Sequence, residues 1–159
     1  MRSVPKSARH GIGTPRHRPE RLHITLFHIG DWAGLSPYTV DAVVAAAESV
    51  NAAPFEIRLN EVASFSGRRE RSPLVLKAHE GNDALHRFRA RLGEALTRAG
   101  FGRRVSKAFE PHVTLAYAAQ QVGAETVDEI RWTATEFVLI HSLLGQTRHI
   151  RLGSWALRV

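Results

Sequence analysis

The stretch Arg21-Leu22-His23-Ile24-Thr25-Leu26-Phe27 has a counterpart far downstream, Pro111-His112-Val113-Thr114-Leu115-Ala116-Tyr117. Each copy reads His, aliphatic, Thr, Leu within a short apolar run whose alternation predicts a β-strand. In a strand, the His and the Thr point to one face and the aliphatic residue between them points to the other. One such triplet is a weak signal, but two copies with matching flanks are a specific pattern. We therefore expect two imidazoles and two hydroxyls to line one cleft.

Composition bounds the class of protein. A chain of 159 residues with 43% hydrophobic residues suits one domain with its own core. The absence of cysteine excludes disulfide frameworks and thiolate metal sites. We find neither an apolar leader segment nor a stretch apolar enough to span a bilayer. The sequence predicts a cytoplasmic protein with no membrane partner.

Positive charge is concentrated at the amino-terminal end. The formal net charge is +7, and residues 1–22 hold six Arg and Lys residues against one Glu, which leaves +2 for the rest. A basic tail on a nearly neutral body is consistent with non-specific attraction to polyanions such as RNA, and equally with a solvated segment. Gly and Pro residues among these charges predict that residues 1–20 are flexible.

Hydrophobic periodicity predicts two helices and six strands. Helical spacing begins after Ser36-Pro37 and again at Asp83, where the second helix ends at Gly100. The predicted helices cover residues 37–51 and 83–99, and the predicted strands cover 21–29, 55–65, 74–79, a segment from His112 to about Tyr117, 131–142 and 148–158. Strands in runs favour an α+β fold with mostly antiparallel sheets and outer helices.

The spacing of the two motifs bears on domain organisation. His23 and His112 lie 89 residues apart, on two predicted strands in different halves of the chain. The simplest arrangement is a single domain, residues 21–159, with two pseudo-symmetric lobes and a central cleft.

Two histidines that share a cleft are suited to concerted acid–base chemistry near neutral pH, because one can be neutral while the other is protonated. A Thr two residues along the same strand face places a hydroxyl donor beside each imidazole. Phosphodiester cleavage needs such a set: a base for the attacking oxygen, an acid for the leaving oxygen, and donors for the charge on the phosphoryl oxygens. This chemistry needs no metal or other cofactor.

Two other chemistries are weaker interpretations of the same residues. A metal site would need a third His or a carboxylate at ligand spacing beside either motif, and hydroxyls are poor ligands for the metals that imidazole favours. A Ser/His/Asp triad is compatible with the composition, but the chain has no G-x-S-x-G turn. We therefore predict no metal ligands.

The paired motifs His23-Ile24-Thr25-Leu26 and His112-Val113-Thr114-Leu115 resemble those of the 2H phosphoesterase superfamily. More narrowly, the chain resembles the bacterial 2′-5′ RNA ligase-like (LigT-like) proteins that act as RNA 2′,3′-cyclic phosphodiesterases. Supporting stretches are Pro19-Glu20-Arg21-Leu22, Phe109-Glu110-Pro111, His141-Ser142-Leu143-Leu144-Gly145 and Leu152-Gly153-Ser154-Trp155. The resemblance covers about residues 10–159.

The resemblance implies a role for each motif residue. His112 would act as general base on water, His23 would protonate the leaving ribose oxygen, and Thr25 and Thr114 would hold the phosphate. Opening a terminal 2′,3′-cyclic phosphate at the 3′ oxygen yields a 2′-phosphate. The reverse attack by an RNA 5′-hydroxyl gives a 2′-5′ linkage with the same two histidines. Implied substrates are RNA ends, such as tRNA fragments, or small cyclic phosphates.

The chain departs from the family pattern before the first motif. Relatives usually begin with an apolar strand and a helix, whereas this chain has a polar, Pro-rich lead. We expect that strand and helix to be missing, which would leave an edge or apolar face that a second copy of the chain could cover.

A second group of residues consists of weaker substrate-binding candidates. The aromatic position five residues after the first His is His28 here, beside Phe27, and the equivalent position after the second His is Tyr117. Strict alternation places His28 and Tyr117 away from the catalytic face unless the strand ends or bulges first. Arg148 and Arg68 could contact phosphate.

Two other functions remain open from the sequence alone. One is a phosphodiesterase that acts on a small cyclic nucleotide. The other is a non-catalytic RNA-binding module that uses the basic tail and the loop at residues 68–71.

Overall fold

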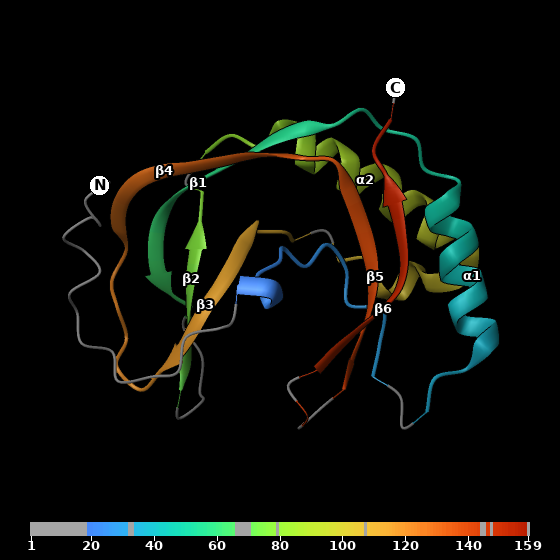
Figure 1. Cartoon of the computed structure of the whole chain (residues 1–159), viewed down its shortest axis with the longest axis horizontal. Coiled ribbons are helices and arrows are strands. Elements are labelled where there is room, and N and C mark those ends of the chain that lie inside the picture. The colour runs from blue at the N-terminus through green and yellow to red at the C-terminus, as the bar shows by residue number, and fades with distance from the viewer. Residues whose placement is uncertain are drawn as a thin grey trace. The chain divides into compact units, whose positions relative to one another are not determined.

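A computed structural model of the chain describes residues 19–31, 34–65, 71–78, 80–106, 108–143, 146 and 148–158 (Figure 1). These residues fall into two compact units, each assembled from three stretches of sequence. Unit 1 contains the described residues up to Thr25, then Arg58–Gly81 and Glu110–Arg131; unit 2 contains Leu26–Ile57, Asn82–Phe109 and the described residues from Trp132 onward. Most of the predicted tail, residues 1–18, lies outside the described residues.

Unit 1 is organised around a four-stranded sheet. Its strands are β1 (Phe55–Ser64), β2 (Ser72–Lys77), β3 (His112–Ala118) and β4 (Glu125–Ala134), in the order β3-β2-β1-β4. β2 pairs antiparallel with β1 and with β3 (Figure 1). Leu74, Val75 and Leu76 are all buried, because the central strand β2 is covered on both faces.

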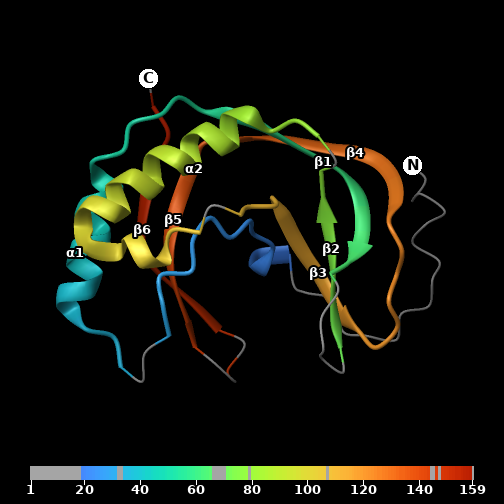
Figure 2. The ribbon, with the colours of Figure 1, turned by 180° about the vertical axis from the view of Figure 1, so that it is seen from behind.

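Unit 2 packs two helices on a β-hairpin. The helices are α1 (Pro37–Glu48) and α2 (Asp83–Leu96), and the hairpin strands β5 (Glu136–Leu143) and β6 (Arg148–Ala156) pair antiparallel (Figure 2). One buried apolar cluster joins the helices to the hairpin: Val43, Ala46, Ala47, Phe88, Leu92, Ala95, Leu96, Phe137 and Leu157. The hydrophobic face of each helix therefore supplies the core of this unit.

Both helices form where periodicity predicts them, although each ends earlier than expected. Pro37 opens α1, a position where its fixed φ and missing N–H suit the first helical turn. After α2 the chain continues through a π-helical turn, η3 (Thr97–Phe101), and a 3-10 helix, η4 (Gly102–Arg104). The predicted cap at Gly100 is wrong for α2, whose cap residue is Thr97, but Gly100 takes a left-handed φ of 94°, which glycine adopts without steric cost, and breaks the helical turns of η3.

The predicted strand at residues 21–29 is wrong. The segment begins as a 3-10 helix, η2 (Pro19–Arg21), and makes a single antiparallel bridge, between Ile24 and Val113. Beyond Thr25 a side chain, and not a neighbouring strand, bonds the backbone: the Leu26 carbonyl accepts a hydrogen bond from Arg89 Nε at 3.0 Å. Apolar alternation alone does not show that a neighbouring strand is available.

A second difference concerns residues 125–143. Sequence periodicity predicts one strand at 131–142, whereas the chain forms β4 and β5, separated at Thr135. β4 is at one end of the strand order and most of its residues are exposed; its first half is largely polar, and only Ile130, Trp132 and Ala134 alternate. The other predicted strands are confirmed, with ends shifted by a few residues.

The predicted α+β class with antiparallel sheets is confirmed. The central cleft, the missing amino-terminal elements and the dimer stay predictions. Among the described residues, no helix has the length and apolar character needed to cross a bilayer. The cytoplasmic location also stays a prediction.

Leu59 provides a test of the unit 1 core. Its side chain has 0% exposure in β1, so Leu59→Ala should lower the free energy of unfolding by about 2–5 kcal/mol through lost burial and a residual cavity. Urea denaturation followed by circular dichroism measures this difference. Leu22, which is 43% exposed, provides the matched Leu→Ala control and should change the free energy by less than about 0.5 kcal/mol. Equal losses in the two variants would contradict the assignment of Leu59 to the core.

Candidate active site

Both H-x-T motifs belong to unit 1, and a backbone bridge brings them together. Ile24 pairs antiparallel with Val113, the middle residue of the second motif. In an antiparallel register, the residues that flank the bridge oppose each other crosswise, so His23 lies opposite Thr114 and Thr25 lies opposite His112. Such opposed residues have Cβ atoms roughly 4.5–5.5 Å apart. The bridge therefore places two imidazoles and two hydroxyls on one face, and the catalytic and phosphate-binding roles of these four residues stay predictions.

The two imidazoles are held in the same way. Nδ1 of His23 lies 2.7 Å from the carbonyl oxygen of Arg21, and Nδ1 of His112 lies 2.7 Å from the carbonyl oxygen of Glu110. A carbonyl only accepts, so each Nδ1 carries the proton and donates it to the residue two positions earlier. Each Nε2 is then the nitrogen that can take up or release a proton. His23 and Thr25 are exposed, whereas His112 and Thr114 are half-buried.

Tyr117 shares the face of His112 and Thr114 because β3 contains a bulge. Tyr117 pairs with Pro73, Thr114 with Val75, and His112 with Lys77, which are alternate residues of β2. The register shift between Leu74 and Val75 leaves one extra residue, Leu115, on β3. Because of that extra residue, the side chains beyond it on β3 change faces. Tyr117 therefore lies on the motif face, where it is 41% exposed.

The His112 imidazole belongs to a network of side-chain contacts. The edge of the Phe65 ring meets the imidazole with centroids 4.7 Å apart, and the Lys77 ammonium lies 5.9 Å from the Phe65 centroid. Lys77 Nζ also pairs with the carboxylates of Glu110 at 2.6 Å and Glu61 at 3.3 Å. Glu110 thus holds the imidazole through its carbonyl and Lys77 through its carboxylate. No sequence pattern indicated Phe65 or Lys77, because they join His112 only through sheet pairing.

Arg21 places a charged donor next to the first motif. Its Nε is buried and, among the described residues, has no hydrogen-bond partner. A buried donor without an acceptor is costly, and an anionic ligand could supply that acceptor. The sequence placed Arg21 in the basic lead and in the stretch before the first motif, without a role in binding.

The weaker candidates make contacts of their own in unit 2. The Phe27 ring packs against the core cluster and under the Arg89 guanidinium, 4.3 Å from ring centroid to Cζ. His28 pairs with Asp31 at 3.1 Å, and Arg148 is an exposed residue that pairs with Leu143 at the start of β6. Arg68 lies outside the described residues. The substrate-binding roles of these residues stay predictions.

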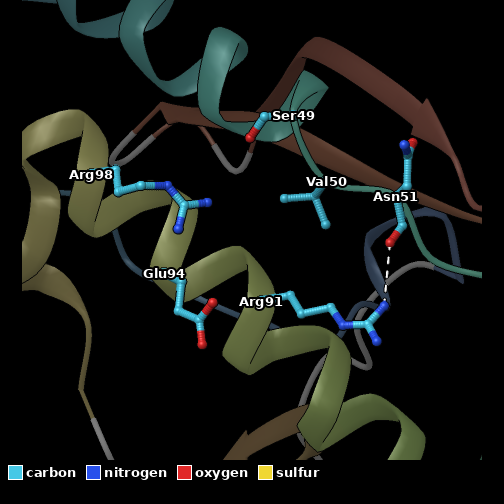
Figure 3. A pocket seen from close by; sticks show the side chains of 6 residues that line it. All are labelled: Ser49, Val50, Asn51, Arg91, Glu94 and Arg98. Atoms are coloured by element: carbon cyan, nitrogen blue, oxygen red, sulfur yellow. Dashed lines mark hydrogen bonds between the residues drawn. The ribbon is translucent and has the colours of Figure 1, made fainter.

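A separate polar pocket in unit 2 contains none of the predicted site residues. Its volume is about 200 Å³, and it is lined by Ser49, Val50, Asn51, Arg91, Glu94 and Arg98 (Figure 3). Arg91 Nη1 donates to the carbonyl oxygen of Asn51 at 3.4 Å across this pocket. Within the described ranges, no cluster of three or more His, Asp or Glu side chains is arranged to hold a metal ion.

Fold and motif geometry together define the class of the 2H phosphoesterases, in which paired H-x-T motifs bring two histidines together. A family model of the 2′-5′ RNA ligase superfamily matches residues 4–146. The chain therefore belongs to the 2′-5′ RNA ligase superfamily, the LigT-like group of the 2H phosphoesterases. A comparison with curated protein sequences finds no match.

Solved structures show the same fold. A crystal structure of a phosphoesterase superimposes with a TM-score of 0.73 at 23% identity, covering 92% of this chain and 83% of that one. E. coli LigT complexed with 3′-AMP gives a TM-score of 0.72 at 23% identity, with 92% and 82% of the two chains covered. TT0787 of Thermus thermophilus gives 0.69 at 24% identity, with 94% and 85% covered. At these identities the likeness concerns the fold.

The Lys77 ion pairs predict a pH-dependent contribution to stability. The hydrogen bond that the Lys77 ammonium donates to the Glu110 carboxylate raises the pKa of Lys77 above its ordinary 10.5. Its stabilising contribution is therefore complete below pH 10.5 and is lost as the pH rises through the raised value. Lys77→Met should lower the free energy of unfolding by about 1 kcal/mol or less near neutral pH, and this deficit should shrink as the pH rises through the raised pKa of Lys77.

Chemical denaturation at several pH values measures the deficit, and Glu110→Gln should reproduce its pH dependence. A Lys77→Met deficit that is the same at every pH would contradict the ion-pair assignment.

Proposed function

We propose that this protein hydrolyses terminal 2′,3′-cyclic phosphates of RNA to 2′-phosphates by two-histidine acid–base catalysis. The observation that carries the proposal is the Ile24–Val113 bridge, which sets His23 opposite Thr114 and Thr25 opposite His112. Two proton-transfer groups and two hydroxyl donors on one face are the set that phosphodiester cleavage requires.

In the proposed reaction, His112 Nε2 takes a proton from water as the water oxygen attacks phosphorus. The bond between phosphorus and the ribose 3′ oxygen breaks, and His23 Nε2 gives its proton to that oxygen. Thr25 and Thr114 donate hydrogen bonds to the non-bridging oxygens, whose charge grows in the transition state. The Nδ1 bonds to the Arg21 and Glu110 carbonyls fix the tautomer of each imidazole before substrate arrives.

Ligands of E. coli LigT support a nucleotide substrate. That protein has been crystallised with 3′-AMP, with ATP and with phosphate. A site with the same fold is suited to a phosphate next to a ribose. The same residues also support the reverse reaction, in which an RNA 5′-hydroxyl attacks the cyclic phosphate and forms a 2′-5′ linkage.

His23→Ala and His112→Ala test the acid–base couple. Each should lower kcat for a 2′,3′-cyclic phosphate oligonucleotide by about 10²–10⁴-fold, because each removes one proton-transfer step. The wild-type rate should persist in a chelator, depend on pH in a bell-shaped manner and give a 2′-phosphate product. Chromatography of a labelled oligonucleotide measures all three.

His141→Ala is the matched control, since His141 lies on β5 in unit 2 and should leave the rate unchanged. Full activity in either motif variant would rule out the proposal. Salt-dependent RNA binding without hydrolysis, retained in both motif variants, would instead favour a binding module.

Thr25→Val and Thr114→Val test phosphate binding. Valine keeps the shape of threonine but removes the hydroxyl donor, so each change should lower kcat by about 10²-fold with little effect on folding. Thr→Ser variants keep the donor and should retain most of the activity. Steady-state kinetics with the same oligonucleotide measures the effect, and wild-type kcat in both valine variants would exclude the hydroxyls as phosphate donors.

A further inference from the structure

Arg89 of α2 contacts both chain segments that lead to the motifs. Its Nε donates to the Leu26 carbonyl at 3.0 Å, and its Nη2 donates to the Ser106 carbonyl at 2.8 Å. Its guanidinium also lies over two aromatic rings, 4.3 Å from the centroids of Phe27 and Phe109. One side chain thus joins the segment that follows the first motif to the segment that precedes the second.

The neighbouring positions on the same face of α2 hold the same two segments. Gly93 lies four residues after Arg89, and a Cβ on Gly93 would come within 3.1 Å of both the Phe27 ring and the Val105 side chain. A side chain at this position would therefore need Phe27 or Val105 to move by a few tenths of an ångström. His86, three residues before Arg89, meets the Phe109 ring edge-on with centroids 5.3 Å apart. Residues 86, 89 and 93 therefore form one face, because residues three and four apart are neighbours on a helix.

The two held segments are continuous with the motif residues. Leu26 directly follows Thr25, and Phe109 lies three residues before His112. The antiparallel contact between the motifs is a single bridge, Ile24–Val113, so few backbone hydrogen bonds fix their register. A displacement of residues 26–27 relative to 106–109 would therefore move Thr25 and His112 relative to each other.

We infer that Arg89 is a positioning residue for the two-histidine site, and that the α2 face formed by His86, Arg89 and Gly93 sets the register of the two H-x-T motifs. Arginine suits this role because its planar guanidinium can donate in two directions while it stacks on aromatic rings, which an ammonium cannot do. Burial lowers the pKa of Arg89, which still remains protonated near neutral pH.

The activity test rests on the proposed function. Arg89→Ala should lower kcat for the 2′,3′-cyclic phosphate oligonucleotide by about 10²-fold with KM nearly unchanged, since a displacement of about 1 Å between catalytic groups has an effect of that size. Added guanidinium ion at low millimolar concentration should restore part of kcat in Arg89→Ala. Arg87→Ala, an exposed arginine on the same helix, is the matched control and should behave as wild type.

A second measurement does not depend on activity. Amide hydrogen exchange should show faster exchange at residues 23–26 and 112–114 in Arg89→Ala than in wild type and Arg87→Ala, with the core of α1 unchanged. Gly93→Ala should show the same local pattern, because its Cβ displaces Phe27 or Val105.

The two measurements separate the possible failures. An inactive wild type with local loss of protection in Arg89→Ala would overturn the proposed function and leave the positioning role supported. Unchanged exchange in Arg89→Ala, or loss of kcat without guanidinium rescue together with exchange that rises throughout the protein, would overturn the positioning role.

Discussion

The single backbone bridge between Ile24 and Val113 is the constraint on which the candidate site depends. In an antiparallel pair, one fixed contact determines which residues oppose each other on either side of it. Here it sets each motif histidine opposite the threonine of the other motif. A shift of one residue would turn the histidines to the opposite face, since side chains alternate along an extended chain.

Local hydrogen bonds then prepare the imidazoles. Each Nδ1 donates to the carbonyl two residues earlier, so the proton on Nδ1 of both rings is fixed by the backbone. Around His112, the Phe65 ring and the Glu110–Lys77 pair limit the motion of the ring further. Preorganised groups of this kind lower the reorganisation needed during a reaction.

Both motifs lie in unit 1, and the chain passes between unit 1 and unit 2 at several points. Two of these passages, Thr25–Leu26 and Phe109–Glu110, lead to the motifs, and α2 holds both on the unit 2 side. The Gly93 contacts show that this helix face is shaped for the segments it carries. The motifs themselves share one backbone bridge, and the contacts between α2 and the adjoining segments accompany it.

The sequence by itself determined the four motif residues, both helices, most strands and the α+β class, because these depend on local periodicity and on a repeated tetrapeptide. It misassigned residues 21–29 as a strand and merged the end of β4 with β5, since strand pairing depends on neighbours and the first half of β4 is largely polar. Tertiary structure alone decided the crosswise opposition of the motifs, the bulge that turns Tyr117 to the motif face, and the contacts of Phe65, Lys77 and Arg89. These features join residues far apart in sequence, and only the register of the folded chain specifies which of them meet.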